Sequence, residues 1–206
     1  EINPEYLLYL PEDYGATGDP WPILFFFHGA GHRGDDLRTL TSMAPLGPVV
    51  NGNEQYPFLV AAPKLPKNGR WREDTTLEEL MTFIREVVGK YNIDESRVYV
   101  SGQSMGGTAT WRLLYEHPDY FAAGIPICGG NRPEWGERLV EMPIWAFHGR
   151  LDTVIVPDYS IDIINTITNA GGTEAKLTIY EDVAHDSWWR AFREPALYDW
   201  MLEQRR

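Results

Sequence analysis

Short apolar runs alternate with longer segments of helical periodicity along the chain, and this alternation limits the fold more than any other feature. The run Ile23 to Phe27 is apolar at every position, which indicates a strand that is buried on both faces. The other runs that we expect to form strands are Tyr6 to Leu10, Phe58 to Ala62, Arg97 to Ser101, Ala122 to Ile127, Pro143 to Phe147 and Lys176 to Tyr180.

Helical patterns separate or follow these runs. The clearest one carries an apolar stripe made of Leu77, Leu80, Met81, Ile84, Val87 and Val88. Further helices are expected at Gly106 to His117, at Pro157 to Ala170, and at Ser187 to Gln204 with an interruption or restart at Pro195. This order predicts an α/β protein, a three-layer α/β/α sandwich around a mostly parallel sheet. Active sites in such sheets form in the loops that follow the carboxyl ends of the strands.

Length and charge narrow the class of protein. The chain has 206 residues, and we expect a single domain over 1–206. Its 18 basic and 30 acidic residues give a net charge of −12, so neither nucleic acid nor a membrane is expected as a partner. Cys128 is the only cysteine, which excludes an internal disulfide and a zinc site made of thiolates. The chain begins at Glu1 without an initiator Met or a signal-like stretch, and we expect a processed protein or a domain excised from a longer chain.

A candidate nucleophile follows the strand at Val98 to Val100. The sequence Gly102-Gln103-Ser104-Met105-Gly106-Gly107 has the pattern G-x-S-x-G between an expected strand and an expected helix. A sharp turn there lifts the serine hydroxyl above the edge of the sheet, and the flanking glycines avoid side-chain clashes. The positive end of the following helix favours negative charge at the serine. Ser104 is therefore the expected nucleophile.

The serine needs a base, and the chain order of this architecture is serine, then acid, then histidine. His185 lies in the loop after the last expected strand and is the expected base. His117 ends a helix, and His148 lacks a suitable preceding acid, so a structural or supporting role is expected for His148. Asp152 follows the strand at Pro143 to Phe147 and is the expected acid, which orients the imidazole. Asp158 is the alternative acid, although its position suits the first turn of a helix better.

The loop His28-Gly29-Ala30-Gly31 follows the phenylalanine-rich strand and is expected to form half of an oxyanion hole. The two donors would be the backbone N–H groups of Ala30 and Met105. The segment 29–34 also matches G-x-G-x-x-G, the fingerprint of dinucleotide-binding proteins. That alternative requires an apolar helix directly after the third glycine, and Asp35, Asp36 and Pro45 argue against one. His28 and His32 lie in a glycine loop rather than on one helix face, so no metal site is expected.

Taken together, these motifs resemble those of the α/β-hydrolase superfamily from Tyr6 to the C-terminus. Within it the chain resembles compact bacterial esterases grouped with feruloyl and acetyl-xylan esterases, polyhydroxybutyrate depolymerases and predicted peptidases. The features are Tyr9-Leu10-Pro11, Asp94-Glu95-Ser96-Arg97-Val98-Tyr99 and His185-Asp186-Ser187-Trp188. The resemblance implies ester hydrolysis without a cofactor and a secreted, extracellular enzyme. Compared with the full fold, the first antiparallel strands are expected to be missing.

The expected substrate is a short-chain or aryl carboxylic ester, free or carried on a polymer such as a plant polysaccharide. The stretch between Ile127 and Pro143 is too short for the helical cap found in many such hydrolases, so we expect an open, shallow site. Trp188, Trp71 and Gln103 are candidates for substrate contact, because aromatic faces near the site could hold an aryl group or a sugar ring. A serine peptidase and a non-catalytic binding module remain as alternatives. The sequence leaves the oligomeric state open.

Overall fold

The computed structural model describes residues 5–52, 54–71 and 74–206. Seven strands form one sheet in the order β1-β3-β2-β4-β5-β6-β7. The strands are β1 (Tyr6–Tyr9), β2 (Trp21–Phe27), β3 (Leu59–Pro63), β4 (Ile93–Gln103), β5 (Ala123–Ile127), β6 (Ile144–Gly149) and β7 (Ala175–Tyr180). β1 is antiparallel to β3, and the remaining neighbours are parallel.

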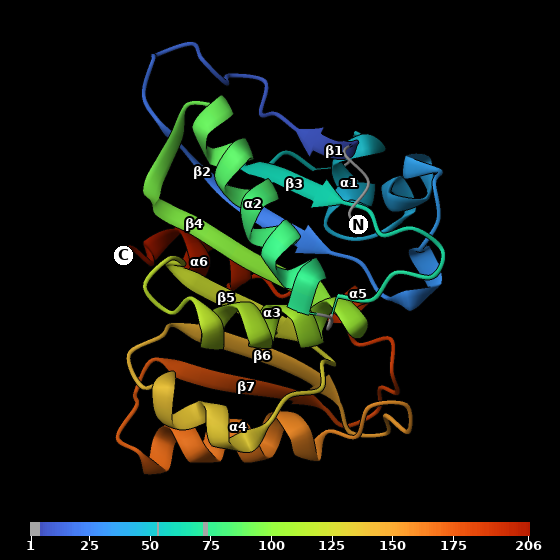
Figure 1. Cartoon of the computed structure of the whole chain (residues 1–206), viewed down its shortest axis with the longest axis vertical. Helices are drawn as coiled ribbons and strands as arrows, with labels where there is room; N and C mark the ends of the chain where they lie inside the picture. Colours follow the sequence, from blue (N-terminus) through green and yellow to red (C-terminus); the bar gives the residue numbers. More distant parts are fainter. Residues whose placement is uncertain (1–4, 53, 72–73) are drawn as a thin grey trace.

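Helices cover both faces of the sheet (Figure 1). One face carries α2 (Asp74–Lys90), α3 (Met105–Glu116) and α4 (Asp158–Asn169). The other face carries the 3₁₀ helix η2 (Leu37–Ser42) with α1 (Leu46–Val50), α5 (Trp188–Ala191) and α6 (Leu197–Glu203). Two further 3₁₀ helices, η1 (Ala30–His32) and η3 (Pro133–Arg138), lie in loops after strands. The predicted α/β/α sandwich with a mostly parallel sheet is confirmed.

The core has two halves because successive side chains of a strand point to opposite faces. Ile23, Phe25 and Phe27 of β2 pack under α2 and α3, and all three are fully buried. Leu24 and Phe26 of the same strand pack against the opposite helices and are equally buried. The continuous apolar run in the sequence therefore reflects a strand at the centre of the sheet with helices on both sides.

Two details differ from the expectations. The expectation that the opening antiparallel strands are missing is wrong for one strand, because β1 pairs with β3 from Tyr6↔Pro63 to Tyr9↔Val60. No helix was predicted in the segment 37–50, which forms the short helices η2 and α1. The predicted interruption of the last helix at Pro195 is confirmed, because α5 ends at Ala191 and α6 begins at Leu197. None of the described helices is long and apolar enough to cross a membrane.

The topology brings four loops to one edge of the sheet. β2 and β4 are parallel neighbours, and their last paired residues are Phe27 and Gly102. The loop after β2 therefore starts beside the turn after β4. β6 and β7 run in the same direction and end at Gly149 and Tyr180, so their loops emerge at the same edge.

Candidate active site

Ser104 sits in a strained turn between β4 and α3. It is the residue before the first turn of α3, and its φ of 55° lies in the left-handed region that non-glycine residues rarely adopt. Its N–H donates to the carbonyl of Ile127 at 2.9 Å, which holds the turn against the end of β5. The hydroxyl therefore projects from a fixed point at the start of α3.

Glycines around the serine allow a close approach of backbones. A Cβ at Gly106 would collide with the carbonyl group of Phe27, and one at Gly107 would collide with the carbonyl oxygen of Ile127. Gly102 is similarly crowded, because its Cβ would meet the carbonyl of Gly106. The pattern G-x-S-x-G-G is thus a steric requirement of this turn, which packs α3 directly onto β2 and β5.

His185 bridges the serine and an aspartate. Its Nε2 lies 2.8 Å from Oγ of Ser104, and its Nδ1 lies 2.7 Å from Oδ2 of Asp152. A carboxylate accepts only, so Nδ1 carries the proton and Nε2 presents a lone pair to the serine hydroxyl. The imidazole is 21% exposed, whereas the side chain of Asp152 is fully buried. The structure therefore brings the three predicted residues into one hydrogen-bonded chain.

Asp152 is held as an anion by several donors. Its Oδ1 accepts from the N–H groups of Val154 at 2.8 Å and Ile155 at 3.0 Å. Burial by itself would raise the pKa of this carboxyl, but the hydrogen bonds from His185, Ile155 and Val154 lower it overall. The alternative acid, Asp158, is the first residue of α4 and takes no part in this chain of hydrogen bonds.

His148 is a second histidine at the aspartate. Its Nε2 lies 3.2 Å from Oδ2 of Asp152 and 2.8 Å from the carbonyl oxygen of Ile155. Both partners are acceptors, so Nε2 carries the proton and Nδ1 accepts from the hydroxyl of Ser160 at 2.8 Å. Burial lowers the pKa of His148, which keeps the ring neutral. A supporting position was predicted for this residue, but its contact with the acid was not.

The two predicted oxyanion donors share one structural feature. Ala30 is the first residue of η1 and Met105 is the first residue of α3. The first N–H of a helix has no partner within that helix, and neither N–H has a hydrogen-bond partner among the described residues. Gly29 places the two segments together, because a Cβ there would lie 3.5 Å from Cβ of Ser104.

His28 and Trp71 support the loop after β2. Nδ1 of His28 donates to the carbonyl of Gly29 at 2.7 Å, and Nε2 accepts from the N–H of Leu65 at 3.1 Å. The indole of Trp71 donates to the carbonyl of His28 at 2.9 Å. These bonds fix the backbone that leads into Ala30. Neither role was predicted, since a lone tryptophan in a loop carries no periodicity that would show which way it faces.

The three residues predicted to contact substrate differ in how far they are exposed. Trp71 is fully buried and its indole donates to the carbonyl of His28, which argues against a substrate contact for it. Gln103 is 2% exposed and lies against Gly29, which argues against a substrate contact for it as well. Trp188 is half-buried and meets the His185 ring edge to face at 5.7 Å. It remains a candidate at the rim of the site.

Cys128 directly follows β5 and lies within 4.8 Å of the side-chain ligand atoms of Asp152 and His185. Burial raises the pKa of this thiol to about 12, so it stays protonated and unreactive near neutral pH. Asp152 and His185 are already bonded to each other. The cluster therefore suits proton transfer better than metal coordination.

The dinucleotide alternative does not fit the segment after β2. Residues 30–52 are all described, and they form η1, η2 and the five-residue α1 rather than a long helix after Gly34. Both ring nitrogens of His28 are already hydrogen-bonded, so a metal site shared with His32 is also disfavoured. The segment is a loop over the serine, without the helix N-terminus that a pyrophosphate needs.

In the part of the chain that the structure describes, no cap is inserted between β5 and β6. The connection from β5 to β6 is fully described and contains only η3. Several large apolar residues after β6 and after His185 are exposed, namely Leu151, Val154, Val156, Tyr159 and Trp189. Exposed apolar side chains thus flank the loops that carry Asp152 and His185.

Known proteins to which this chain is similar are hydrolases. Residues 68–130, which hold α2, β4, Ser104 and α3, match the prolyl oligopeptidase family. Acyl-protein thioesterase 1 of Candida albicans is 28% identical over 200 residues, covering 80% of this chain and 84% of that protein. Acetylxylan esterase A of Emericella nidulans is 33% identical over 87 residues, covering 37% of this chain and 29% of that protein.

A solved structure extends the likeness to nearly the whole chain. A thermostable esterase superposes with a TM-score of 0.83 at 33% identity, covering 98% of this chain. The chain spans 59% of that esterase, so the larger protein contains further structure. That esterase shares the arrangement of strands and helices that holds Ser104, Asp152 and His185 here.

Proposed function

Because this chain has the α/β-hydrolase fold and is related to esterases, we propose that it is a serine carboxylesterase. Ser104 is the nucleophile, His185 the base and Asp152 the group that orients the base. The observation that carries the proposal is the hydrogen-bonded chain from Ser104 through His185 to Asp152, at 2.8 and 2.7 Å. These distances match those required for general-base activation of a serine.

The first half of the reaction forms an acyl-enzyme. Oγ of Ser104 attacks the ester carbonyl carbon while its proton passes to Nε2 of His185. The carbonyl oxygen becomes an anion between the N–H groups of Ala30 and Met105, each of which is worth about 10²–10³ in rate where such donors have been removed. Collapse of this intermediate breaks the bond to the alcohol oxygen, and the alcohol leaves with the proton from Nε2.

The second half releases the acid. Water loses a proton to Nε2 of His185 as its oxygen attacks the acyl carbon. The same two N–H groups hold the second oxyanion. The proton then returns to Oγ of Ser104, and the carboxylic acid departs. Asp152 stays ionised throughout and stabilises the imidazolium that forms in both halves.

The proposed substrates are short-chain or aryl carboxylic esters, including those borne on plant polysaccharide. The uncapped β5–β6 connection supports this, because it leaves room for a bulky alcohol beside the serine. The likeness to an acetylxylan esterase points in the same direction. Trp188, which contacts His185, is the proposed aromatic contact for an aryl acyl group.

The test is hydrolysis of 4-nitrophenyl acetate together with labelling by a fluorophosphonate probe. Wild-type protein should turn over the ester and carry the label on Ser104, as located by mass spectrometry. Ser104→Ala should lose at least about 10³-fold in kcat and all labelling. Ser42→Ala, which removes an exposed hydroxyl in η2, is the matched control and should behave as wild type. Turnover by Ser104→Ala above a few per cent of wild type would overturn the assignment.

A serine peptidase is the second candidate. The match to the prolyl oligopeptidase family over residues 68–130 favours it, since the same groups cleave amides. A panel of peptide amides run beside nitrophenyl and feruloyl esters separates the two. Esterase function predicts that the ester kcat/KM exceeds every amide value, and the reverse order would favour the peptidase.

A further inference from the structure

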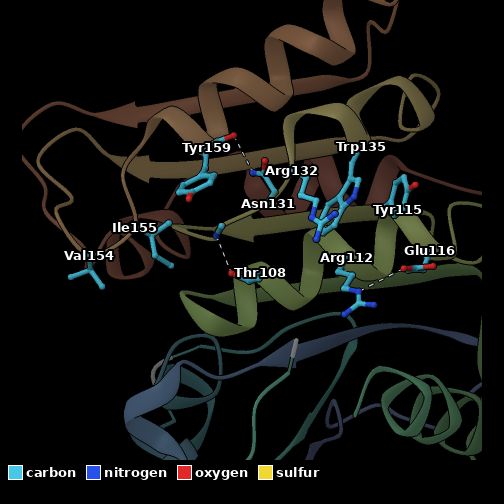
Figure 2. A pocket seen from close by; sticks show the side chains of 11 residues that line it. Thr108, Arg112, Tyr115, Glu116, Asn131, Arg132, Trp135, Val154, Ile155 and Tyr159 are labelled. Carbon is cyan, nitrogen blue, oxygen red and sulfur yellow. Dashed lines mark hydrogen bonds and ion pairs between the residues drawn. The ribbon is translucent and has the colours of Figure 1, made fainter. Parts of the chain in front are cut away.

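A groove of about 660 Å³ runs along α3, away from the serine. Its walls are α3, the segment 130–135 and the segment 154–159, and we call it the α3 groove. Val154 and Ile155 lie at one end, and Trp135, Tyr115 and Glu116 lie at the other (Figure 2). None of the reaction steps above uses its far end.

The near end of the groove is lined by residues that lie next to the proposed catalytic residues in the chain or in contact with them. Ile155 donates its N–H to Asp152, and Thr108 lies one helical turn after Ser104. Thr108 also accepts from the N–H of Gly130 at 2.9 Å, which ties the 130–135 wall to α3. At 1.5 Å per residue, the groove extends from about 6 Å to about 18 Å beyond Ser104 along the helix. A substrate in it would therefore extend away from the reacting ester.

Asn131 leaves an unmet hydrogen-bonding requirement in this groove. The residue is 9% exposed, and its Nδ2 donates to the carbonyl of Tyr159 at 3.0 Å. Its Oδ1 is buried and has no hydrogen-bond partner among the described residues. Buried polar atoms in folded proteins nearly always have a partner, so this oxygen indicates a missing donor.

Trp135 offers a fixed aromatic surface. Its ring stacks on Tyr115 with the centroids 5.0 Å apart and an interplanar angle of 16°. The guanidinium of Arg138 lies 5.4 Å from the centre of the Tyr115 ring. The indole is only half-buried, and Tyr159 across the groove is 42% exposed. Aromatic side chains held in this way present flat surfaces to a ligand.

The charged groups of the groove come in both signs. Arg112 pairs with Glu116 at 3.6 Å, and Arg132 is exposed beside them. A multiply charged anion would be repelled by the carboxylate of Glu116. An alkyl chain would leave Oδ1 of Asn131 without a hydrogen-bond donor. A neutral chain of hydroxyl groups satisfies all of these residues, because each hydroxyl both donates and accepts. Sugar rings also present apolar faces to an indole.

We propose that the α3 groove binds the carbohydrate chain that carries the ester cleaved at Ser104. The inference rests on the proposed esterase function for the reacting end of the substrate. Asn131 accepts from a sugar hydroxyl, Trp135 stacks on a sugar ring, and Arg132 donates to ring or hydroxyl oxygens. The groove is thus a specificity site beyond the catalytic residues.

The experiment compares two acetyl esters, 4-nitrophenyl acetate and acetylated xylohexaose. Trp135→Ala and Arg132→Ala should lower kcat/KM for the xylohexaose ester by about tenfold, mostly through KM, and leave the nitrophenyl ester within about twofold. Arg85→Ala removes an exposed arginine of α2 outside the groove and should change neither. Arg132 is exposed, so its variant tests the groove even if Trp135→Ala proves unstable.

A binding measurement separates the groove from the chemistry. Ser104→Ala protein is titrated with unacetylated xylohexaose and cellohexaose by calorimetry, and at least one should bind, with weaker binding after Arg132→Ala is added. Failure of both sugars to bind, or equal slowing of both esters by the groove variants, would overturn the inference and leave the esterase intact. If wild-type protein hydrolysed neither ester, the proposed function would be overturned instead. The titration would then still show whether the α3 groove binds a sugar chain.

Discussion

His148 places its Nε2 atom 3.2 Å from the Oδ2 atom of Asp152, the same oxygen that accepts from His185. The carboxylate is therefore oriented from two sides of the hydrogen-bonded chain. The second histidine is itself oriented by Ser160. Orientation of the base thus depends on residues from β6, from the loop after it and from α4.

We expect His148→Leu to lower kcat by about 10- to 100-fold, because one hydrogen bond to a charged group is lost. KM should change little. Ser160→Ala removes only the hydroxyl that His148 accepts and should cost a few-fold. Steady-state kinetics on 4-nitrophenyl acetate, with thermal unfolding in parallel, measures both effects. A large drop in Tm with unchanged kcat would show that His148 acts on stability alone.

Asp152→Asn should be far more harmful than Asp158→Asn. The amide can donate to Nδ1 of His185 and so favours the wrong tautomer, a change that costs up to about 10⁴ in kcat in serine-protease triads. Asp158 begins α4 and serves as the matched control, with kcat near that of wild type. If Asp158→Asn were the damaging change, the acid would be misassigned.

Stability should fall as the pH drops from neutral toward 4. Burial lowers the pKa of His28 from 6.5 to about 4. The unfolded chain therefore binds a proton in this window that the folded protein does not, and the free energy of unfolding decreases by up to about 3 kcal/mol. Urea denaturation at pH 7, 5.5 and 4 measures the slope.

His28→Gln is the comparison for that slope. Removing the imidazole should flatten the dependence between pH 6.5 and 4, even if the variant is less stable at every pH. Parallel curves for wild type and variant would mean that other groups, such as the buried His148, account for the acid sensitivity.

Two glycine substitutions should act in opposite directions. Gly106→Ala forces a Cβ against the carbonyl group of Phe27 and should lower the free energy of unfolding by about 3 kcal/mol or more. Gly89→Ala, in α2 with open space around its Cβ position, should raise it by up to about 1 kcal/mol. Denaturation curves of both variants provide the check, and a stable, fully active Gly106→Ala would contradict the packing described for the turn.

Much of the sheet could be predicted because its strands are buried on both faces, so each reads as an apolar run such as Ile23 to Phe27. The order of Ser104, Asp152 and His185 along the chain was also visible, since each follows a strand. Contacts that depend on how a loop folds back could not be predicted from the sequence. The approach of His148 to Asp152 arises in the turn between Gly149 and Ile155, and the burial of Trp71 arises from packing on His28.

The antiparallel pairing of β1 was missed for a related reason. The run at Tyr6 to Leu10 indicated a strand. The direction of β1 in the sheet depends on how it pairs with β3, and the residues of β1 alone do not show it. The environment of Asn131 was likewise hidden, because an amide after two glycines looks like an ordinary turn until α3 and α4 pack around it.

The short link between β5 and β6 bears on how this protein would work on long chains. Because this link contains no cap that must move, binding of an ester at Ser104 should not require a conformational change of the protein. We expect kcat/KM to be insensitive to added viscogen and to follow the leaving ability of the alcohol. An ester in the middle of a polymer would then be as reachable as one at its tip.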